Sequence, residues 1–480
     1  MSSLADDTRW MDATAQAELV AKGQVSPREL VDAAIERIDK YDSKVHALTY
    51  RWFDDARRLA DGAELPRGPF RGVPFLLKDL FAAEAGKPLS NGNKAYKEAG
   101  YVSDSDTELV ARYKRAGLVT LGRTNSPELG SVPVTEPEAW GPSRNPWDLS
   151  RTPGGSSGGA AAAVASGMVP FAHASDGGGS IRIPASCCGL VGLKTSQGRI
   201  TMAPFRDESG LGVEHCVSRT VRDTARLLDA THGPGVGDTV IAPAPIRPYV
   251  DELGVDPGRL RIGLLDHSPR GFAVHQDCVT GVHDAAKLLE SLGHHVEPAW
   301  PEVLADPALG QAFGAMWSTN MGVSLRRFAD ALGRAITQDD VELMNWAQAE
   351  FAKNVSGVDY ALALSAASTF RRAVQSWWSE GWDILLTPTL SEPPIPVGTI
   401  VNSRERAMAP LVRSGEWVTF TNQFNMSGQP AISLPLHRTA TGLPVGIQLV
   451  AAYGREDLLI RVASQLEVAR PWAHLTPDLD

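Results

Sequence analysis

The sequence predicts an α/β fold in one large domain. Segments with helical periodicity alternate with short apolar segments typical of strands along most of the chain. The chain has no internal repeat and no linker of disordered composition, so a single domain over residues 1–480 is the simplest organisation. A composition of 43% hydrophobic and 21% charged residues is ample for the buried core of a globular protein.

The first clear helix is predicted to begin after Ser26. A capping-box pattern with proline at the first helical position is followed there by apolar residues at helical spacing, up to Ile38. Next in order we expect a helix over residues 107–116, a strand over 118–121 and a further helix that begins at Ser126.

The alternation continues in the C-terminal half, where apolar runs typical of buried strands are separated by helical patterns. The predicted strands cover residues 260–266, 295–297, 383–386, 431–434 and 445–450, and the predicted helices cover residues 279–292 and 455–467. Proline-rich residues 243–257 are expected to form a surface excursion.

Charge and hydropathy exclude several classes of protein. The net charge of −10 disfavours binding to nucleic acid or to a membrane surface, and no block of lysine and arginine stands out. The N-terminus has no basic region followed by an apolar one, and no apolar span reaches 18 residues. We therefore expect neither a signal peptide nor a transmembrane helix.

The cysteines and histidines do not predict a metal site. None of the four cysteines forms a C-x-x-C pair, which argues against zinc and favours a reducing, cytoplasmic location. His294 and His295 are adjacent, but no H-E-x-x-H pattern surrounds them. A structural or surface role is the better interpretation of this pair.

The glycine-rich centre of the chain contains the first chemical motif, Gly-Gly-Ser-Ser-Gly-Gly at residues 154–159. It matches the G-x-S-x-G nucleophile elbow, but that motif requires a preceding buried strand. Residues 145–153 contain two prolines and are expected to form a loop, which disfavours the elbow. A phosphate-binding loop is disfavoured too, because no Gly-Lys-Ser/Thr follows. A flexible turn is the simplest alternative, but it leaves the two serines unexplained.

A second motif is the glycine run ahead of Ser180. The N–H groups of Gly177, Gly178 and Gly179 can face one point and form a nest for a developing oxyanion. Ser180, which ends the run, is then well placed to attack. A glycine-rich turn with a solvated serine is the alternative interpretation.

A third signal is Lys78, which follows five apolar residues on a predicted buried strand. Burial disfavours the ammonium form and lowers the pKa of a lysine, so that it can act as a base. The alternative is a structural lysine that pairs with a carboxylate such as that of Asp79.

Together, these three segments in this order resemble the signature of the amidase signature family. Later segments, such as Gly-Gln-Pro-Ala at residues 428–431, are also similar, so the resemblance covers essentially the whole chain, with a signature core at about residues 70–200. It implies one domain with a central mixed β-sheet flanked by helices. It also implies an acyl-enzyme mechanism that needs no cofactor or metal.

The resemblance implies a role for each residue of the motifs. Lys78 matches the general base, Ser156 the bridging serine that follows a cis peptide bond, and Ser180 the nucleophile. The oxyanion donors fall on Gly177, Gly178, Gly179 and Ser180, and supporting roles fall on Ser157, Asp176 and Arg182. Gly177 departs from the many members that have a branched residue at its position.

Peripheral segments, including Thr-Glu-Pro-Glu-Ala-Trp-Gly at residues 135–141, resemble the branch of the family that contains nylon-oligomer amidases. This favours a stand-alone amidase for small linear or cyclic amides. The alternatives are a carbamate-cleaving urethanase, an aryl acylamidase, the glutamine-hydrolysing subunit of a tRNA-dependent amidotransferase, and a non-catalytic binding protein. The expected partner is a small-molecule amide, with no nucleic acid and no membrane, and the chain is compatible with a homodimer.

The resemblance also points to two pocket residues. Ser131 follows a turn beside the acyl site, and Trp317 lies where the nylon-oligomer branch builds another wall. A large and a small side chain predict an apolar slot with few fixed polar contacts and hence broad specificity. The alternative is that either residue only packs the core.

Overall fold

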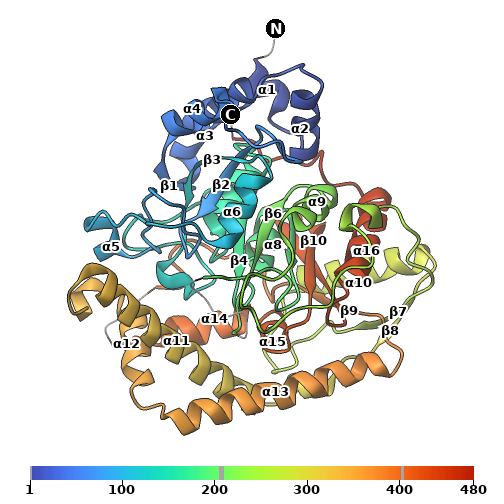
Figure 1. Cartoon of the computed structure of the whole chain (residues 1–480). Helices are drawn as coiled ribbons and strands as arrows, with labels where there is room; N and C mark the ends of the chain where they lie inside the picture. Colours follow the sequence, from blue (N-terminus) through green and yellow to red (C-terminus); the bar gives the residue numbers. More distant parts are fainter. Residues whose placement is uncertain (1–2, 205–209, 402–404, 480) are drawn as a thin grey trace.

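The computed structural model describes residues 3–204, 210–401 and 405–479. Within them, a large mixed sheet runs through the molecule (Figure 1). Its eight strands are, in spatial order, β4 (Phe171–Asp176), β6 (Val213–Ser218), β5 (Val191–Lys194), β10 (Ala431–Arg438), β11 (Pro444–Ala451), β9 (Ile384–Pro388), β7 (Arg261–Leu264) and β8 (His295–Pro298). Pairing is antiparallel from β4 to β9, and β7 is parallel to both β9 and β8. The α/β fold with a central mixed sheet is confirmed.

A smaller sheet contributes the lysine of the first motif. In the described part of the chain its strands are, in spatial order, β1 (Leu48–Arg51), β3 (Val119–Thr124) and β2 (Pro74–Lys78). All five residues of β2 are buried, and the strand packs against β4 of the large sheet. This contact brings the end of β2 next to the glycine run that follows β4.

Helices cover both sheets. Those of the first third of the chain are α1 (Leu4–Thr8), α2 (Ala13–Ala21), α3 (Pro27–Val45), α4 (Phe53–Asp61), α5 (Lys94–Glu98), α6 (Glu108–Arg115) and α7 (Gly158–Ala165). Helix α7 also packs on β4 and β6 of the large sheet, and four later helices pack on the same sheet: α8 (Arg182–Cys188), α9 (Val221–Thr231), α10 (Gln276–Ser291) and α16 (Glu456–Ala469). Among them, α10 connects the parallel strands β7 and β8.

Three further helices form an excursion between β8 and β9, along the lower edge of the molecule in Figure 1: α11 (Ala308–Leu332), α12 (Leu343–Ala352) and α13 (Gly357–Ser379). Helix α11 packs on both of the others. The remaining elements are α14 (Ala409–Trp417), α15 (Gln423–Met426) and the 3₁₀ turns η1 (Glu128–Gly130), η2 (Tyr249–Glu252), η3 (Glu302–Ala305) and η4 (Gln338–Asp340).

Local sequence signals explain most of these elements. Ser26 and Glu29 form the predicted capping box of α3, with Pro27 at the first helical position. Thr107 caps α6 as expected. The predicted strands of the C-terminal half correspond to β7 to β11, and the two predicted helices there correspond to α10 and α16, with boundaries shifted by a few residues.

The helix predicted from Ser126 is wrong. Only the 3₁₀ turn η1 follows, because Leu129 and Gly130 both adopt positive φ angles, 54° and 67°, and the chain leaves the helical path there. The helices α11 to α13 were not anticipated as elements. Glycines and polar residues interrupt the apolar pattern of α11, so its sequence alone gives a weak helical signal.

The glycine-dense centre packs as closely as its composition predicts. A Cβ atom on Gly155 would lie 2.8 Å from the backbone of Pro133 and Val134, and one on Gly159 would lie 2.4 Å from the backbone nitrogen of Asn125. Side chains at these positions would push the serine loop away from the segment that follows β3. The glycines therefore fix the position of the two serines between them.

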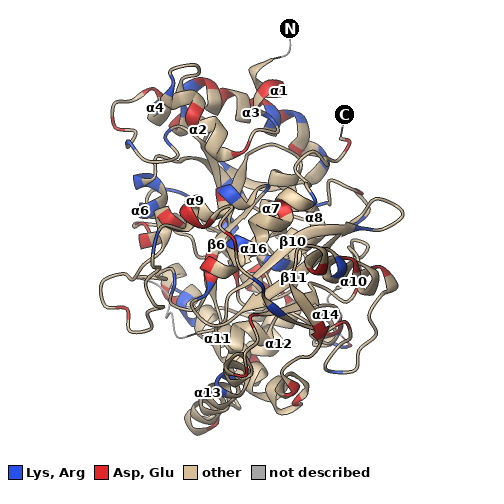
Figure 2. Cartoon of the chain, turned by 90° about the vertical axis from the view of Figure 1, so that its right-hand side faces the viewer, with Lys and Arg blue, Asp and Glu red and all other residues tan. Residues whose placement is uncertain are grey.

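Charged residues of both signs are spread along the helices of the described residues (Figure 2). The four cysteines are buried and unpaired by disulfides. In the part of the chain that the structure covers, no helix is both long and apolar enough to cross a membrane.

Candidate active site

Lys78 lies at the end of β2 and is fully buried. Its Nζ donates to Ser156 Oγ at 2.7 Å and to Ser175 Oγ at 3.0 Å. The Asp79 carboxylate accepts hydrogen bonds from the backbone N–H and the hydroxyl of Ser90. The lysine side chain thus points away from solvent and towards two serine hydroxyls, one of which belongs to the first glycine-serine motif.

Ser156 follows a cis peptide bond from Gly155 and precedes α7. Only 2% of the residue is exposed. The neighbouring Ser157 connects the loop to β4, because its Oγ donates to Ser175 O at 3.2 Å and accepts from Ser175 N at 3.3 Å. Since Ser175 also accepts from Lys78, these contacts hold the lysine, the serine loop and β4 in one buried unit.

Asp176 and Arg182 form a buried ion pair behind the glycine run. Arg182 donates through Nε to Asp176 Oδ2 and through Nη2 to Asp176 Oδ1, each at 2.9 Å. It donates further to Thr421 O, Gln448 Oε1 and Asn425 Oδ1. Burial opposes ionisation of Asp176, but the guanidinium holds the pKa of this carboxyl well below its usual range. The pair is therefore charged and rigidly held.

The Asp176 carboxylate shapes the turn that carries Ser180. Its Oδ1 accepts from the N–H of Gly179 at 2.7 Å, and its Oδ2 accepts from the N–H of Ile181 at 3.2 Å. Gly179 has φ +136°, and a Cβ atom there would lie 2.5 Å from Thr421 Oγ1. Only glycine fits this position.

This geometry changes the expected set of oxyanion donors. The Gly179 N–H is directed to the Asp176 carboxylate and not to the space beside Ser180. Among the described residues, no hydrogen bond occupies the N–H groups of Gly177 and Gly178, which are partly exposed. Gly178 lines one cavity and Gly177 lines a second, and Ser180 lines both.

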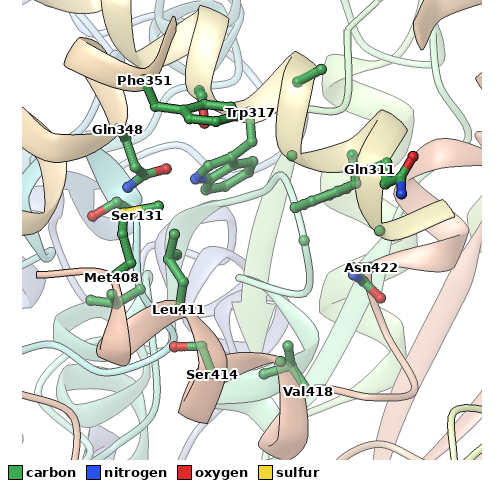
Figure 3. Close-up of a pocket in the computed structure, with 18 of the residues that line it drawn as sticks. Ser131, Gln311, Trp317, Gln348, Phe351, Met408, Leu411, Ser414, Val418 and Asn422 are labelled. Carbon is green, nitrogen blue, oxygen red and sulfur yellow. The ribbon is translucent and has the colours of Figure 1, made fainter. Parts of the chain in front are cut away.

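The larger cavity has a volume of about 660 Å³ and the smaller one about 310 Å³, and Gly130, Ser180 and Trp317 line both. Ser156 lines the smaller cavity. Ser131 lines the larger one (Figure 3). Trp317 stacks on Phe313 of the same helix, with ring centroids 5.3 Å apart. The two pocket residues expected from the sequence thus line the larger cavity together with Ser180, and Trp317 also lines the smaller one.

The chain is similar to known proteins over nearly its whole length. The sequence profile of the Amidase family matches residues 29–460. The chain belongs to the amidase signature family. It is therefore an enzyme that hydrolyses amide bonds.

This amidase is 43% identical to the 6-aminohexanoate-cyclic-dimer hydrolase of Paenarthrobacter ureafaciens, over 98% of this chain and 97% of the relative. A solved structure of 6-aminohexanoate cyclic dimer hydrolase superposes with a TM-score of 0.95 at 42% identity, covering 98% of this chain and 99% of that one. A bacterial aryl acylamidase of the same family superposes with a TM-score of 0.87 at 29% identity, covering 97% and 98%. The resemblance to the family and its nylon-oligomer branch is confirmed.

Sequence reasoning missed several residues at the amidase site. His173 Nδ1 accepts from the backbone N–H of Lys78 at 3.2 Å, so the proton lies on Nε2, which donates to Glu214 at 2.8 Å. His173 and Ser175 are two positions apart on β4 and share one face of it. The two-residue spacing of His173 and Ser175 was the sequence signal that could have identified them, because both side chains contact Lys78.

Proposed function

We propose that this amidase cleaves small linear or cyclic amides through an acyl-enzyme on Ser180. Ser156 acts as the proton relay and Lys78 as the general base. The observation that carries the proposal is the 2.7 Å hydrogen bond between the fully buried Lys78 Nζ and Ser156 Oγ, which lines the same cavity as Ser180. Burial favours the neutral amine, which is the form that can accept a proton.

The reaction follows from these positions. Ser180 Oγ attacks the amide carbonyl and passes its proton to Ser156, whose own proton goes to Lys78. The N–H groups of Gly177 and Gly178, with that of Ser180, stabilise the oxyanion. The proton then returns through Ser156 to the leaving nitrogen, the C–N bond breaks, and the amine departs. Water repeats the sequence on the ester and releases the acid.

The supporting residues hold these groups in place. The buried pair Asp176–Arg182 fixes the turn of residues 177–180 through its bond to the Gly179 N–H. Ser157 fixes the loop of Ser156 against β4. Such preorganisation keeps donors and nucleophile aligned without reorganisation during the reaction.

The larger cavity supports an extended, mostly apolar substrate. Its wall includes Ile183, Phe313, Leu411 and Val418, and a volume of about 660 Å³ accommodates a medium-length acyl or amine group. The name of the relative from Paenarthrobacter states that it hydrolyses 6-aminohexanoate cyclic dimer. We therefore place oligomers of aminoalkanoic acids among the preferred substrates.

A second candidate activity is aryl acylamidase. The stacked rings of Phe313 and Trp317 offer an aromatic wall beside Ser180, and an aryl acylamidase is among the similar structures. The same wall would accept an aryl carbamate, which is the urethanase alternative. The cavity can accept either an aromatic leaving group or an oligoamide. The two activities therefore use the same catalytic residues and differ in rate.

Steady-state kinetics on five substrates tests the proposal: a cyclic aminohexanoate dimer, a linear oligomer, an anilide, an aryl carbamate and glutamine. We expect the first three to have the highest kcat/KM and glutamine to be weak. A wide preference for glutamine would replace the proposal with the amidotransferase subunit.

We further infer that residues 1–480 form one domain with its signature core at about residues 70–200, and that the enzyme acts in the cytoplasm. The core contains β2, the serine loop and the glycine run. The four buried cysteines without disulfides suit a reducing compartment. A homodimer stays a prediction.

A further inference from the structure

Two polar atoms in the larger cavity are buried and have no hydrogen-bond partner: Trp317 Nε1 and Gln348 Oε1. Gln348 is fully buried on α12, whereas Trp317 comes from α11. Figure 3 shows the indole nitrogen and the glutamine amide turned towards each other, close to Ser131. One atom is a donor and the other an acceptor.

A chain of buried side chains fixes the orientation of the Gln348 amide. Glu128 Oε2 accepts from Asn345 Nδ2 at 2.6 Å. The Asn345 Oδ1 therefore points away from Glu128, and it accepts a hydrogen bond from Gln348 Nε2 at 3.4 Å. The Gln348 Oε1 is thus the end of the amide that is left to face the cavity.

Within the described residues, no protein group pairs with these atoms. The cavity wall includes apolar groups such as Phe351, Val355, Met408 and Leu411. Buried polar atoms without partners are unfavourable in a folded protein and are normally paired. An adjacent donor and acceptor that face one cavity mark the place where a ligand group with the complementary pair would bind.

A secondary amide has this complementary pair, because its carbonyl accepts and its N–H donates. We propose that Trp317 Nε1 and Gln348 Oε1 bind a second amide group of the substrate, away from the bond that Ser180 cleaves. This inference rests on the proposed function and narrows it: the preferred substrates are diamides and longer oligoamides. An apolar slot discriminates weakly, whereas paired buried polar atoms reject a substrate that lacks the matching group.

Matched substrates test this inference. One series consists of acyl p-nitroanilides with an internal –CO–NH– unit placed three to six methylenes from the scissile carbonyl. Each has a partner in which –CH₂–CH₂– replaces that unit. We expect the ratio of kcat/KM within a pair to favour the amide at least tenfold at the best spacing.

The variants Gln348→Leu and Trp317→Phe each remove one polar atom and keep most of the side-chain volume. We expect each to lower this ratio at least fivefold. Gln375→Leu is the matched control, because Gln375 has an unpartnered amide nitrogen on α13 but does not line either cavity at Ser180. It should keep the wild-type ratio. Thermal melts of all three variants verify folding. If one cavity variant fails to fold, the other still tests the inference.

Three outcomes would overturn the inference: a wild-type ratio near one at every spacing, a ratio unchanged in both cavity variants, or an equal loss in Gln375→Leu. In these cases the anilides are still hydrolysed, so the proposed function stands. If wild-type enzyme cleaves neither member of any pair and Ser180 does not react with a fluorophosphonate, the proposed function fails and this inference fails with it.

Discussion

At the residue scale, the proposed chemistry depends on the surroundings of one lysine. Lys78 is fully buried, and its Nζ contacts the hydroxyls of Ser156 and Ser175. Desolvation disfavours the ammonium form, and the contact with Ser156 gives the neutral amine a proton donor within hydrogen-bond distance. Burial thus prepares Lys78 for its role as the base of the proposed mechanism.

Replacement of this lysine tests the relay. We expect Lys78→Ala to lower kcat/KM on amides by about 10²–10⁴-fold, the range typical of general acid–base groups. An activated ester should lose less, because its leaving group departs without a proton. Parallel kinetics on an anilide and a p-nitrophenyl ester of the same acid measure both, and equal losses would argue against the relay.

A second buried lysine predicts a pH dependence of stability. Burial, reinforced by the positive charge of Arg182, lowers the pKa of Lys194 to about 7. In the unfolded chain the pKa of a lysine is about 10.4, so between these values only the unfolded chain retains the proton. The contribution of Lys194 to the free energy of unfolding should therefore increase as pH rises from 7 to 10.

The variant Lys194→Met isolates this effect. Urea titrations at pH 7, 8.5 and 10 should show the wild type gaining stability relative to the variant as pH rises. A constant difference over this range would contradict the assignment. Within the described residues, Lys194 Nζ donates one hydrogen bond, to Thr195 O at 2.9 Å, so the substitution disturbs few interactions.

At the element scale, the turn between β4 and α8 converts a buried ion pair into active-site geometry. Asp176 closes β4 and Arg182 opens α8, and their contact spans the glycine run between them. The carboxylate accepts from the N–H of Gly179, which bends the chain so that Gly177 and Gly178 lie at the cavities. The position of Ser180 is therefore set by both elements.

Gly179→Ala tests the turn. A Cβ atom at this position meets Thr421 Oγ1 at 2.5 Å and forces an L residue into φ +136°. We expect kcat/KM on an anilide to fall by about 10²-fold or more, because a displaced turn misplaces the N–H groups of Gly177 and Gly178, and loss of one oxyanion donor costs about 10²–10³-fold. Gly322→Ala in α11 is the control: its Cβ has ordinary contacts, and alanine should raise helix stability by up to about 1 kcal/mol. Similar losses in both variants would contradict the account.

At the scale of the whole molecule, the site combines segments that are local in sequence with contacts that are not. The motifs around Lys78, Ser156 and Ser180 could be identified from the sequence, because glycine runs and a lysine on an apolar strand are local patterns. The strands and helices with clear periodicity or caps, such as α3, could be predicted for the same reason.

The wall of the larger cavity could not be predicted in this way. Gln348 faces the cavity because Asn345 bonds to Glu128, and those two residues are 217 positions apart. No local pattern encodes such a contact. Likewise, a turn with positive φ angles stands where a helix was expected from Ser126. Gly130 in this turn lies close to Ser156. Tertiary packing overrode the local signal there.

Covalent labelling identifies the nucleophile of the proposed mechanism. A fluorophosphonate probe reacts with a serine that its surroundings activate, and digestion followed by mass spectrometry locates the label. We expect a single label on Ser180 and its loss in Ser180→Ala, together with loss of amide turnover. A label on Ser156 or Ser157, or labelling that persists in Ser180→Ala, would contradict it.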